Sequence, residues 1–419
     1  MRMKIKCVIA ASVAAITMPL AAQNLKVTAL PGHDWWWKSP DVPELTLNIA
    51  NVDGQTVNTD LNILVTTDAF MPVKSTGCKV SIGKNAQALI KYSPGEVAPG
   101  FYRLTVKDGD KQLMTMNFGY EPEKVVSPTD AQTDLRAYWD KALADLAVVP
   151  GNYTMTELPE KSGKARKMYL VSMTSLDGDT ISGYLMLPVK PGKYPAHIYY
   201  NGYGAQPWEM NPESNPEWIE FQTYVRGQGL NAKYNKYGDW IVYNLDNLDH
   251  YYYRGAFMDA VRFIDFIYQL PQADTRYIFA EGGSQGGALT LAAAALDKRV
   301  KAIAPYIPFL SDYTDYFKIV NWPAEPVLKA AKQKGITDEE LYKTLSYFDI
   351  KNLAGWIACP VLMGVGLQDP VCPPHTNFSG YNLITSPKEF IIYPDKEHTV
   401  DYSDWSPRVN RFFERFIAK

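Results

Sequence analysis

The chain has 419 residues, with 42 Lys+Arg against 45 Asp+Glu, 46% hydrophobic residues and 13% aromatic residues. This composition is typical of a globular protein and excludes a disordered, collagen-like or disulfide-framework chain. The net charge of −3 argues against a nucleic-acid partner, and the length exceeds what one hydrophobic core usually serves, so we expect two domains.

The first 22 residues have the pattern of a secretory signal peptide. Arg2, Lys4 and Lys6 precede a small, apolar run from Cys7 to Ala22. That run is shorter than the roughly 20 residues that a membrane span needs, and its small residues near Ala22 suit cleavage. We therefore expect residues 1–22 to be removed and the protein to be exported, periplasmic or extracellular, with no integral membrane span. An uncleaved anchor is the alternative.

The sequence pattern of residues 23–122 predicts a small all-β domain with an immunoglobulin-like sandwich fold. Short runs of alternating polar and apolar residues are separated by turns rich in Gly, Pro, Asn and Asp. Strands at this spacing are typical of a small antiparallel sandwich. No catalytic constellation occurs in this region. The expected strands are residues 45–49, 61–65, 88–92, 101–106 and 113–118.

From residue 123 onward the pattern changes to alternating strands and helices. Apolar residues at helical spacing predict a first helix over 134–146. The alternation beyond it is typical of a mostly parallel sheet covered by helices on both faces, so we expect an α/β domain over residues 123–419. The expected strands are 196–201, 240–245, 277–280, 302–306, 361–367 and 390–393, and the later helices are 257–270, 287–296 and 405–418.

The strongest chemical signal is a G-x-S-x-G motif directly after a predicted strand and before a predicted helix. Such a turn is tight, so Gly282 and Gly286 can flank Ser284, whose hydroxyl is then exposed as a nucleophile. The amide of Gln285 would face the developing oxyanion, and we nominate the Tyr203 amide, in the glycine-containing loop 201–205, as the second donor. The alternative is a Gly-rich turn with an idle serine.

A serine nucleophile needs a base, and the base needs an acid to orient it. In this class of sheet the chain order is Ser, acid, His. We choose His398, in a loop before the last helix, over His375, which is too close to the acid loop to be a separate arm. As the acid we choose Asp369, directly after a predicted strand. Asp395, only three residues from His398, is the competing choice.

Cysteine and histidine usage points away from disulfides and metal sites. Cys359 and Cys372 flank the predicted strand 361–367, whose ends would lie about 20 Å apart at about 3.3 Å per residue. A disulfide needs Cα atoms within about 7 Å, so we expect no bridge between them. The chain has no HExxH and no CxxC pair, so we expect no metal and no cofactor.

Several longer stretches go beyond a generic hydrolase pattern. They are residues 224–229, 251–254 with 259–262, 282–302 and 366–374. In this order they resemble carbohydrate esterase family seven, which groups acetyl xylan esterases with cephalosporin-C deacetylases. The resemblance covers roughly residues 134–419.

The resemblance implies an α/β-hydrolase that removes acetyl groups from sugar hydroxyls with a Ser–His–Asp triad. It carries the family's RGQ element over to Arg226, Gly227 and Gln228, and the family's oxyanion tyrosine over to Tyr203. A guanidinium offers five donors in a fixed fork, which suits Arg226 to bracing the loops of the site by their carbonyls.

The sequence departs from the family pattern in two places. Thr399 stands where the family usually has Glu after the catalytic histidine, which bears on the local support of His398. The sandwich domain is additional to the short family form, which assembles as a closed hexamer. The extra domain can forbid that assembly, so a homo-oligomer stays open.

We therefore expect a secreted serine esterase of two domains that deacetylates acetylated carbohydrate, such as xylan or xylo-oligosaccharides, and small acetyl esters. Another acyl hydrolase on the same scaffold is the enzymatic alternative, such as a peptidase, a thioesterase or a glucuronoyl esterase. A carbohydrate-binding protein with an inactive hydrolase domain is the alternative from another class. The complete Ser, Asp and His set argues against it.

Overall fold

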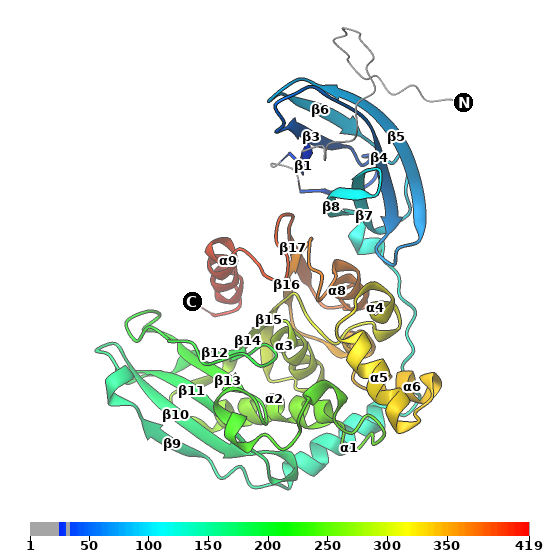
Figure 1. Cartoon of the computed structure of the whole chain (residues 1–419). Coiled ribbons are helices and arrows are strands. Elements are labelled where there is room, and N and C mark those ends of the chain that lie inside the picture. The colour runs from blue at the N-terminus through cyan, green and yellow to red at the C-terminus, as the bar shows by residue number, and fades with distance from the viewer. Residues whose placement is uncertain (1–24, 31–33, 419) are drawn as a thin grey trace. The chain divides into compact units, whose positions relative to one another are not determined.

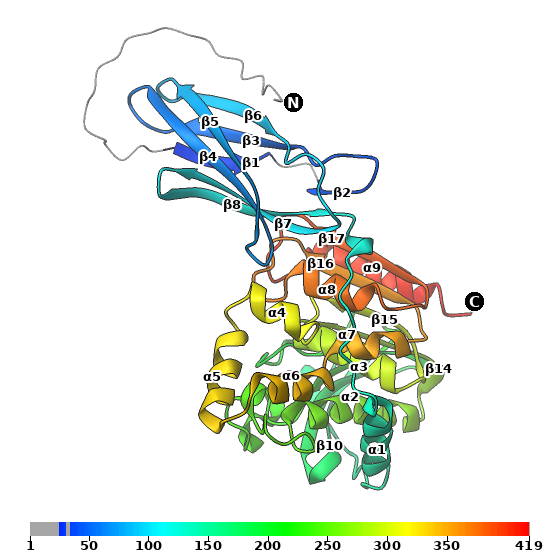
Figure 2. The same cartoon turned by 90° about the vertical axis from the view of Figure 1, so that its right-hand side faces the viewer.

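The computed structural model describes residues 25–30 and 34–418 of the chain. It divides the chain into two compact units, Met1–Val125 and Val126–Lys419 (Figures 1 and 2). The expected boundary at 122/123 lies just before this division, and the expected signal peptide lies outside the described residues. Among the residues described, no helix combines the length and apolar character that crossing a membrane requires.

The first unit consists of two β-sheets that share one hydrophobic core. Alternate residues point to opposite faces of a strand, and Leu45, Leu47 and Ile49 are accordingly buried with Leu61 and Ile63 of the other sheet. One sheet has the order β1 (Leu25–Ala29), β3 (Leu45–Asn51), β6 (Gln87–Tyr92). The other has the order β2 (Trp36–Trp37), β8 (Lys111–Tyr120), β7 (Gly100–Asp108), β4 (Val57–Thr67), β5 (Pro72–Ile82).

The second unit is built on a nine-stranded sheet. Six of its neighbouring strands run parallel, and the three at the β9 edge pair antiparallel. The α/β class and the mostly parallel sheet are thereby confirmed. The order is β17 (Lys388–Tyr393), β16 (Val361–Gly366), β15 (Val300–Tyr306), β14 (Ala273–Gly283), β12 (Tyr194–Tyr200), β13 (Ile219–Tyr224), β11 (Thr180–Pro188), β10 (Arg166–Thr174), β9 (Thr154–Glu157).

Helices cover this sheet, and strand β14 shows how its two faces are used. Tyr277 and Phe279 pack against Trp405 and Phe413 of α9 (Tyr402–Glu414). The alternating residues of β14 point the other way, toward the side on which α2 (Tyr252–Gln269) and α3 (Gln285–Leu296) contact the strand (Figure 1). The remaining helices are α1 (Leu135–Ala147), α4 (Tyr313–Ile319), α5 (Ala324–Lys334), α6 (Asp338–Ser346), α7 (Ile350–Leu353) and α8 (Pro374–Tyr381).

The structure differs from the sequence prediction in three respects in this unit, the first being that the prediction contained none of the helices α4 to α8. Residues 240–245 do not form a strand: Trp240–Val242 is a short 3-10 helix. The Asp239 side chain accepts a hydrogen bond from the Ile241 amide at 3.4 Å and so caps this turn, although the apolar run reads as a strand. The sequence analysis also missed β9, β10, β11 and β13, which extend the sheet beyond β12.

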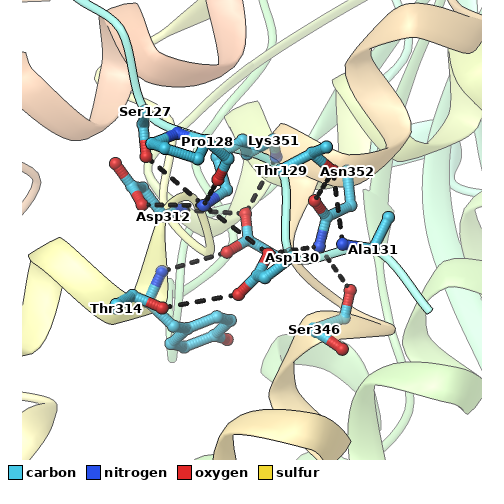
Figure 3. Close-up of polar contacts among 12 residues, drawn as sticks. Ser127, Pro128, Thr129, Asp130, Ala131, Asp312, Thr314, Ser346, Lys351 and Asn352 are labelled. Atoms are coloured by element: carbon cyan, nitrogen blue, oxygen red, sulfur yellow. Dashed lines mark hydrogen bonds and ion pairs between the residues drawn. The ribbon is translucent and has the colours of Figure 1, made fainter.

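The beginning of the second unit is fastened to its helical part by a buried lysine, as Figure 3 shows. Lys351 has a side chain that is 1% exposed, and its Nζ donates to Pro128 O at 3.0 Å and to Asp312 Oδ1 at 3.0 Å. Beside it, Asn352 Nδ2 donates to Asp130 Oδ1 at 2.8 Å. A buried ammonium requires partners of this kind, so the segment is held by groups that cannot easily release it.

Candidate active site

Ser284 occupies the tight turn between β14 and α3. Its backbone has φ 56° and ψ −122°, a conformation that is strained for a residue with a Cβ. The turn leaves no room around it: a Cβ on Gly282 would lie 2.5 Å from the Gly286 carbonyl carbon, and one on Gly286 would lie 2.0 Å from Tyr200 O. Both positions therefore require glycine, and the serine side chain projects clear of the sheet.

His398 links this serine to a buried carboxylate. Its Nε2 lies 3.0 Å from Ser284 Oγ, and its Nδ1 lies 2.8 Å and 3.0 Å from the two carboxylate oxygens of Asp369. The Asp369 side chain is 0% exposed, and its Oδ1 accepts the amides of Val371 and Cys372, each at 2.8 Å. With Nδ1–H donated to Asp369, Nε2 carries the lone pair that faces the serine.

The competing histidine and acid lie elsewhere. His375 Nε2 is 3.7 Å from Asp312 and 3.5 Å from Asp315, at the start of α4. Asp395 has a side chain that is 67% exposed, and it pairs with Lys396 at 3.6 Å. The structure thus brings Ser284, Asp369 and His398 together and leaves these two side chains in other surroundings.

Gln228 ties together the two loops that carry the nominated oxyanion donors. Gln285 is the first residue of α3, so its backbone N–H has no acceptor within the helix. Gln228 is 3% exposed; its Oε1 accepts the Gly204 amide at 2.9 Å, and its Nε2 donates to Gln285 Oε1 at 3.0 Å. The Tyr203 hydroxyl donates to Asp239 at 2.9 Å, so only its backbone is available as a donor to substrate.

Arg226 braces the loop that carries Gln228. Its Nε and backbone N donate to Asp259 Oδ2 at 2.9 Å, and its Nη2 donates to Asp259 Oδ1 at 2.7 Å. A further bond joins Nη1 to Asp179 at 2.9 Å, and Gly227 follows with φ 70°. Arg226 is 3% exposed and makes no hydrogen bond to Ser284 or His398 among the described contacts, so it positions the loop.

Cys372 lies in the site, although the sequence analysis considered it only as a disulfide candidate. The thiol is 1% exposed and its hydrogen-bonding neighbours are the side chains of Tyr316 and Ser284. Burial, and then the charge of Asp369, raise the pKa of this thiol well above its usual range. The thiol therefore stays neutral, and the three described cysteines are all unbridged.

A pocket of about 580 Å³ opens beside the serine on the α9 side of the sheet. Ser284 and His398 form part of its wall, and Glu281, at the end of β14, forms another part. No sequence motif singled out Glu281, because its contacts are with Trp405 and His197, which are distant in the chain. Other lining residues are Tyr199, Asn201, Trp208, Asn215, Tyr306, Tyr402, Ser406 and Asn410.

Two groups of side chains in the described part of the chain come close enough to share a cation. One is Asp369, Cys372 and His398, whose imidazole and carboxylate are already hydrogen-bonded to each other. The other is centred on His375, where Asp312 pairs with a lysine at 3.0 Å and Asp315 with another at 2.8 Å. Carboxylates that are neutralised by ammonium groups are poor cation ligands, so neither group suggests a cofactor.

Comparison with known proteins gives concordant similarities. The family described as acetyl xylan esterase (AXE1) matches residues 120–414. The acetyl esterase Axe7A of Xylanibacter ruminicola is 29% identical over 397 residues, which are 91% of this chain and 88% of that protein. Acetyl xylan esterase 1 from Thermoanaerobacterium sp. JW/SL YS485 superimposes with a TM-score of 0.66 at 28% identity, over 71% of this chain and 98% of that one. The acetyl xylan esterase from Paenibacillus sp. R4 gives 0.65 at 29% identity, over 71% and 99%.

Proposed function

Because this chain belongs to the acetyl xylan esterase family, and is thus a carboxylic-ester hydrolase of the α/β-hydrolase fold, we propose that it removes acetyl groups from acetylated xylan, xylo-oligosaccharides and small acetyl esters. The observation that carries this proposal is the hydrogen-bonded series Ser284–His398–Asp369 at a strained strand-to-helix turn. This is the arrangement that acyl transfer to a serine requires.

In the first half of the reaction the acetyl group moves to the enzyme. Ser284 Oγ attacks the acetyl carbonyl carbon while His398 Nε2 takes the hydroxyl proton. The carbonyl oxygen becomes an oxyanion, and the amides of Tyr203 and Gln285 donate to it. As the tetrahedral intermediate collapses, the bond to the sugar oxygen breaks and His398 returns the proton to that oxygen. Asp369 holds the imidazole and stabilises its protonated form.

In the second half, water releases acetate by the same route. His398 takes a proton from the water, whose oxygen attacks the acetyl carbon, and the same two amides again receive the oxyanion. The bond to Ser284 then breaks, and His398 donates the proton to Oγ. The free enzyme is restored without any redox step, so the chemistry needs only water as the second substrate.

The test is acetate release from acetylated xylan, acetylated xylo-oligosaccharides and 4-nitrophenyl acetate. Ser284→Ala should lower kcat by about a thousandfold or more on all three substrates. The matched control is Ser75→Ala, an exposed serine on β5 of the first unit, which should keep full activity. Acetate release by the Ser284→Ala protein at the normal rate would refute the proposed nucleophile.

We also propose that the protein is exported after cleavage near Ala22. The support is the cationic start and the short apolar run that follows it. Mass spectrometry of the protein isolated from its host should give a mature chain that begins at or near Gln23. An intact chain that begins at Met1 would contradict this proposal.

A further inference from the structure

The loop between β17 and α9, which we call the base loop, carries the histidine of the proposed triad, on which this inference rests. It runs from Pro394, directly after the last residue of β17, to Asp401, the N-cap of α9. His398 has to place Nε2 3.0 Å from Ser284 Oγ and Nδ1 2.8 Å from Asp369 at the same time. Catalytic groups must be held within about 0.5 Å of the productive geometry, so the position of this loop decides whether the triad works.

The side chain of Thr399, directly after the histidine, bonds within the base loop in the structure described. Its hydroxyl donates to Val400 O, the carbonyl of its own neighbour, at 3.2 Å. Such a local bond shapes the backbone around it but joins no second element of the fold. Support for the position of His398 therefore has to reach the base loop from another part of the fold.

Gln368, the residue directly before the acid, donates twice to the base loop. Its backbone N donates to Lys396 O at 2.9 Å, and its side-chain Nε2 donates to Pro394 O at 2.8 Å. These two acceptors lie two and four residues before His398. Two consecutive residues, Gln368 and Asp369, therefore hold the backbone of the base loop and its imidazole.

The end of β16 and the base loop are also in close backbone contact. A Cβ on Gly366 would lie 2.0 Å from Glu397 O, and Leu367 N donates to Tyr393 O at 3.0 Å. These contacts bring the two segments together whatever side chains they carry. The carboxamide of Gln368 adds a bond that depends on its side chain, so a substitution can remove this bond while the backbone contacts remain.

We propose that Gln368 is a positioning residue, whose carboxamide keeps the base loop in register with the acid so that His398 faces Asp369 and Ser284 together. Gln368 acts through the histidine. Without its bond to Pro394 the loop stays near β16 but samples positions in which Nε2 and Ser284 Oγ are farther apart. A displacement of about 1 Å can cost about 10²-fold in rate, so the chemical step should slow while substrate binding is kept.

The first experiment uses Gln368→Met, which fills a similar volume without a donor. Its kcat on 4-nitrophenyl acetate should fall about tenfold or more, with KM within about twofold of the unsubstituted protein and the unfolding midpoint within about 4 °C. The matched control is Gln269→Met. Gln269 is an exposed glutamine at the end of α2, and its Nε2 also donates to a backbone carbonyl, Asp265 O, at 3.3 Å. The control should keep the original kcat.

The second experiment separates positioning of the histidine from general support of the fold. In Asp369→Asn the imidazole has already lost its acid, so adding Gln368→Met should lower kcat by only about twofold or less. A residue that merely stabilises the fold would lower kcat by the same factor in both backgrounds. The comparison therefore reports on the path through His398.

A normal kcat in Gln368→Met, a change in KM alone, or the same loss of kcat in both backgrounds overturns the inference. Absence of ester hydrolysis by the unsubstituted protein would instead overturn the proposed function. The two failures are distinguishable because the first is seen only in an enzyme that is active before substitution.

Discussion

Replacing Asp369 by Asn should leave the fold intact and disable the base. Oδ1 of Asp369 accepts the amides of Val371 and Cys372, each at 2.8 Å, and the amide oxygen of Asn can keep both bonds. The Asn NH₂ group is then left facing His398 Nδ1. It can only donate, so Nδ1 must accept, and the imidazole proton moves to Nε2, where it faces Ser284 and prevents the nitrogen from taking the hydroxyl proton.

The expected loss follows from this change of tautomer. In the serine protease triad the corresponding substitution lowers kcat about 10⁴-fold, which corresponds to about 5.4 kcal/mol of barrier at 1.36 kcal/mol per decade. A similar loss is expected here because Asp369 is fully buried and water cannot replace its carboxylate. The assay is steady-state hydrolysis of 4-nitrophenyl acetate, with the thermal unfolding midpoint measured in parallel to show that the variant is folded.

Asp395→Asn is the matched control. Its side chain is 67% exposed and pairs only with Lys396 among the described contacts, so its loss should change kcat by about twofold or less. The reasoning is refuted if Asp369→Asn turns over at a near-normal rate. A severe loss in Asp395→Asn would move the role of the acid to that residue.

Four further outcomes follow from the structure. Gln228→Ala leaves buried amide groups in both oxyanion loops unpaired, and kcat on 4-nitrophenyl acetate should fall about 10²-fold with little change in KM; a change in KM alone would contradict the assigned role. A protein that begins at Val126 should keep kcat within about tenfold, or about 1.4 kcal/mol. One that begins at Leu135 removes three partners of Lys351, namely Ser127, Pro128 and Asp130, and should unfold about 5 °C lower in a thermal scan. Equal midpoints would contradict a role of this segment in stability. Burial raises the pKa of Cys359 to about 12, so at pH 8 roughly one thiol in 10,000 is ionised. Iodoacetamide should therefore label Cys359 slowly in the native protein and quickly in guanidinium. Rapid labelling of the native protein would contradict the burial of this thiol.

The central geometry of the site could be predicted because its constraints are local or follow chain order. The turn around Ser284 has room only for glycine at positions 282 and 286, so the G-x-S-x-G motif can be recognised in the sequence. The acid and the histidine follow from the order of the strands that precede them, β16 and β17. The space around the turn and the order of the strands each require a particular residue type at a particular position. Such requirements can be seen in the sequence itself.

Glu281 and Gln228 show what a sequence does not display. Glu281 has the pattern of the polar end of a strand. Its contacts with His197 and Trp405 arise only through the sheet order and the packing of α9. Gln228 could be placed near the site, but not its contacts with both oxyanion loops. The prediction of a strand over 240–245 was wrong: these residues include a 3-10 turn capped by Asp239, and the apolar pattern alone does not display that cap.

The fastening of the second unit at Lys351 has a consequence for how the gene can change. The bonds to Pro128 and Asp130 begin only a few residues after Val125, where the first unit ends. Ser127, whose hydroxyl accepts from the Lys351 ammonium at 3.3 Å, is the first of the ammonium's partners in the chain. Everything upstream of Ser127 can therefore be exchanged, lengthened or lost without removing a partner from the buried ammonium. A recombination event at this junction would therefore attach a different N-terminal domain to the same catalytic unit. The contacts of Lys351 and Asn352 within that unit would be kept.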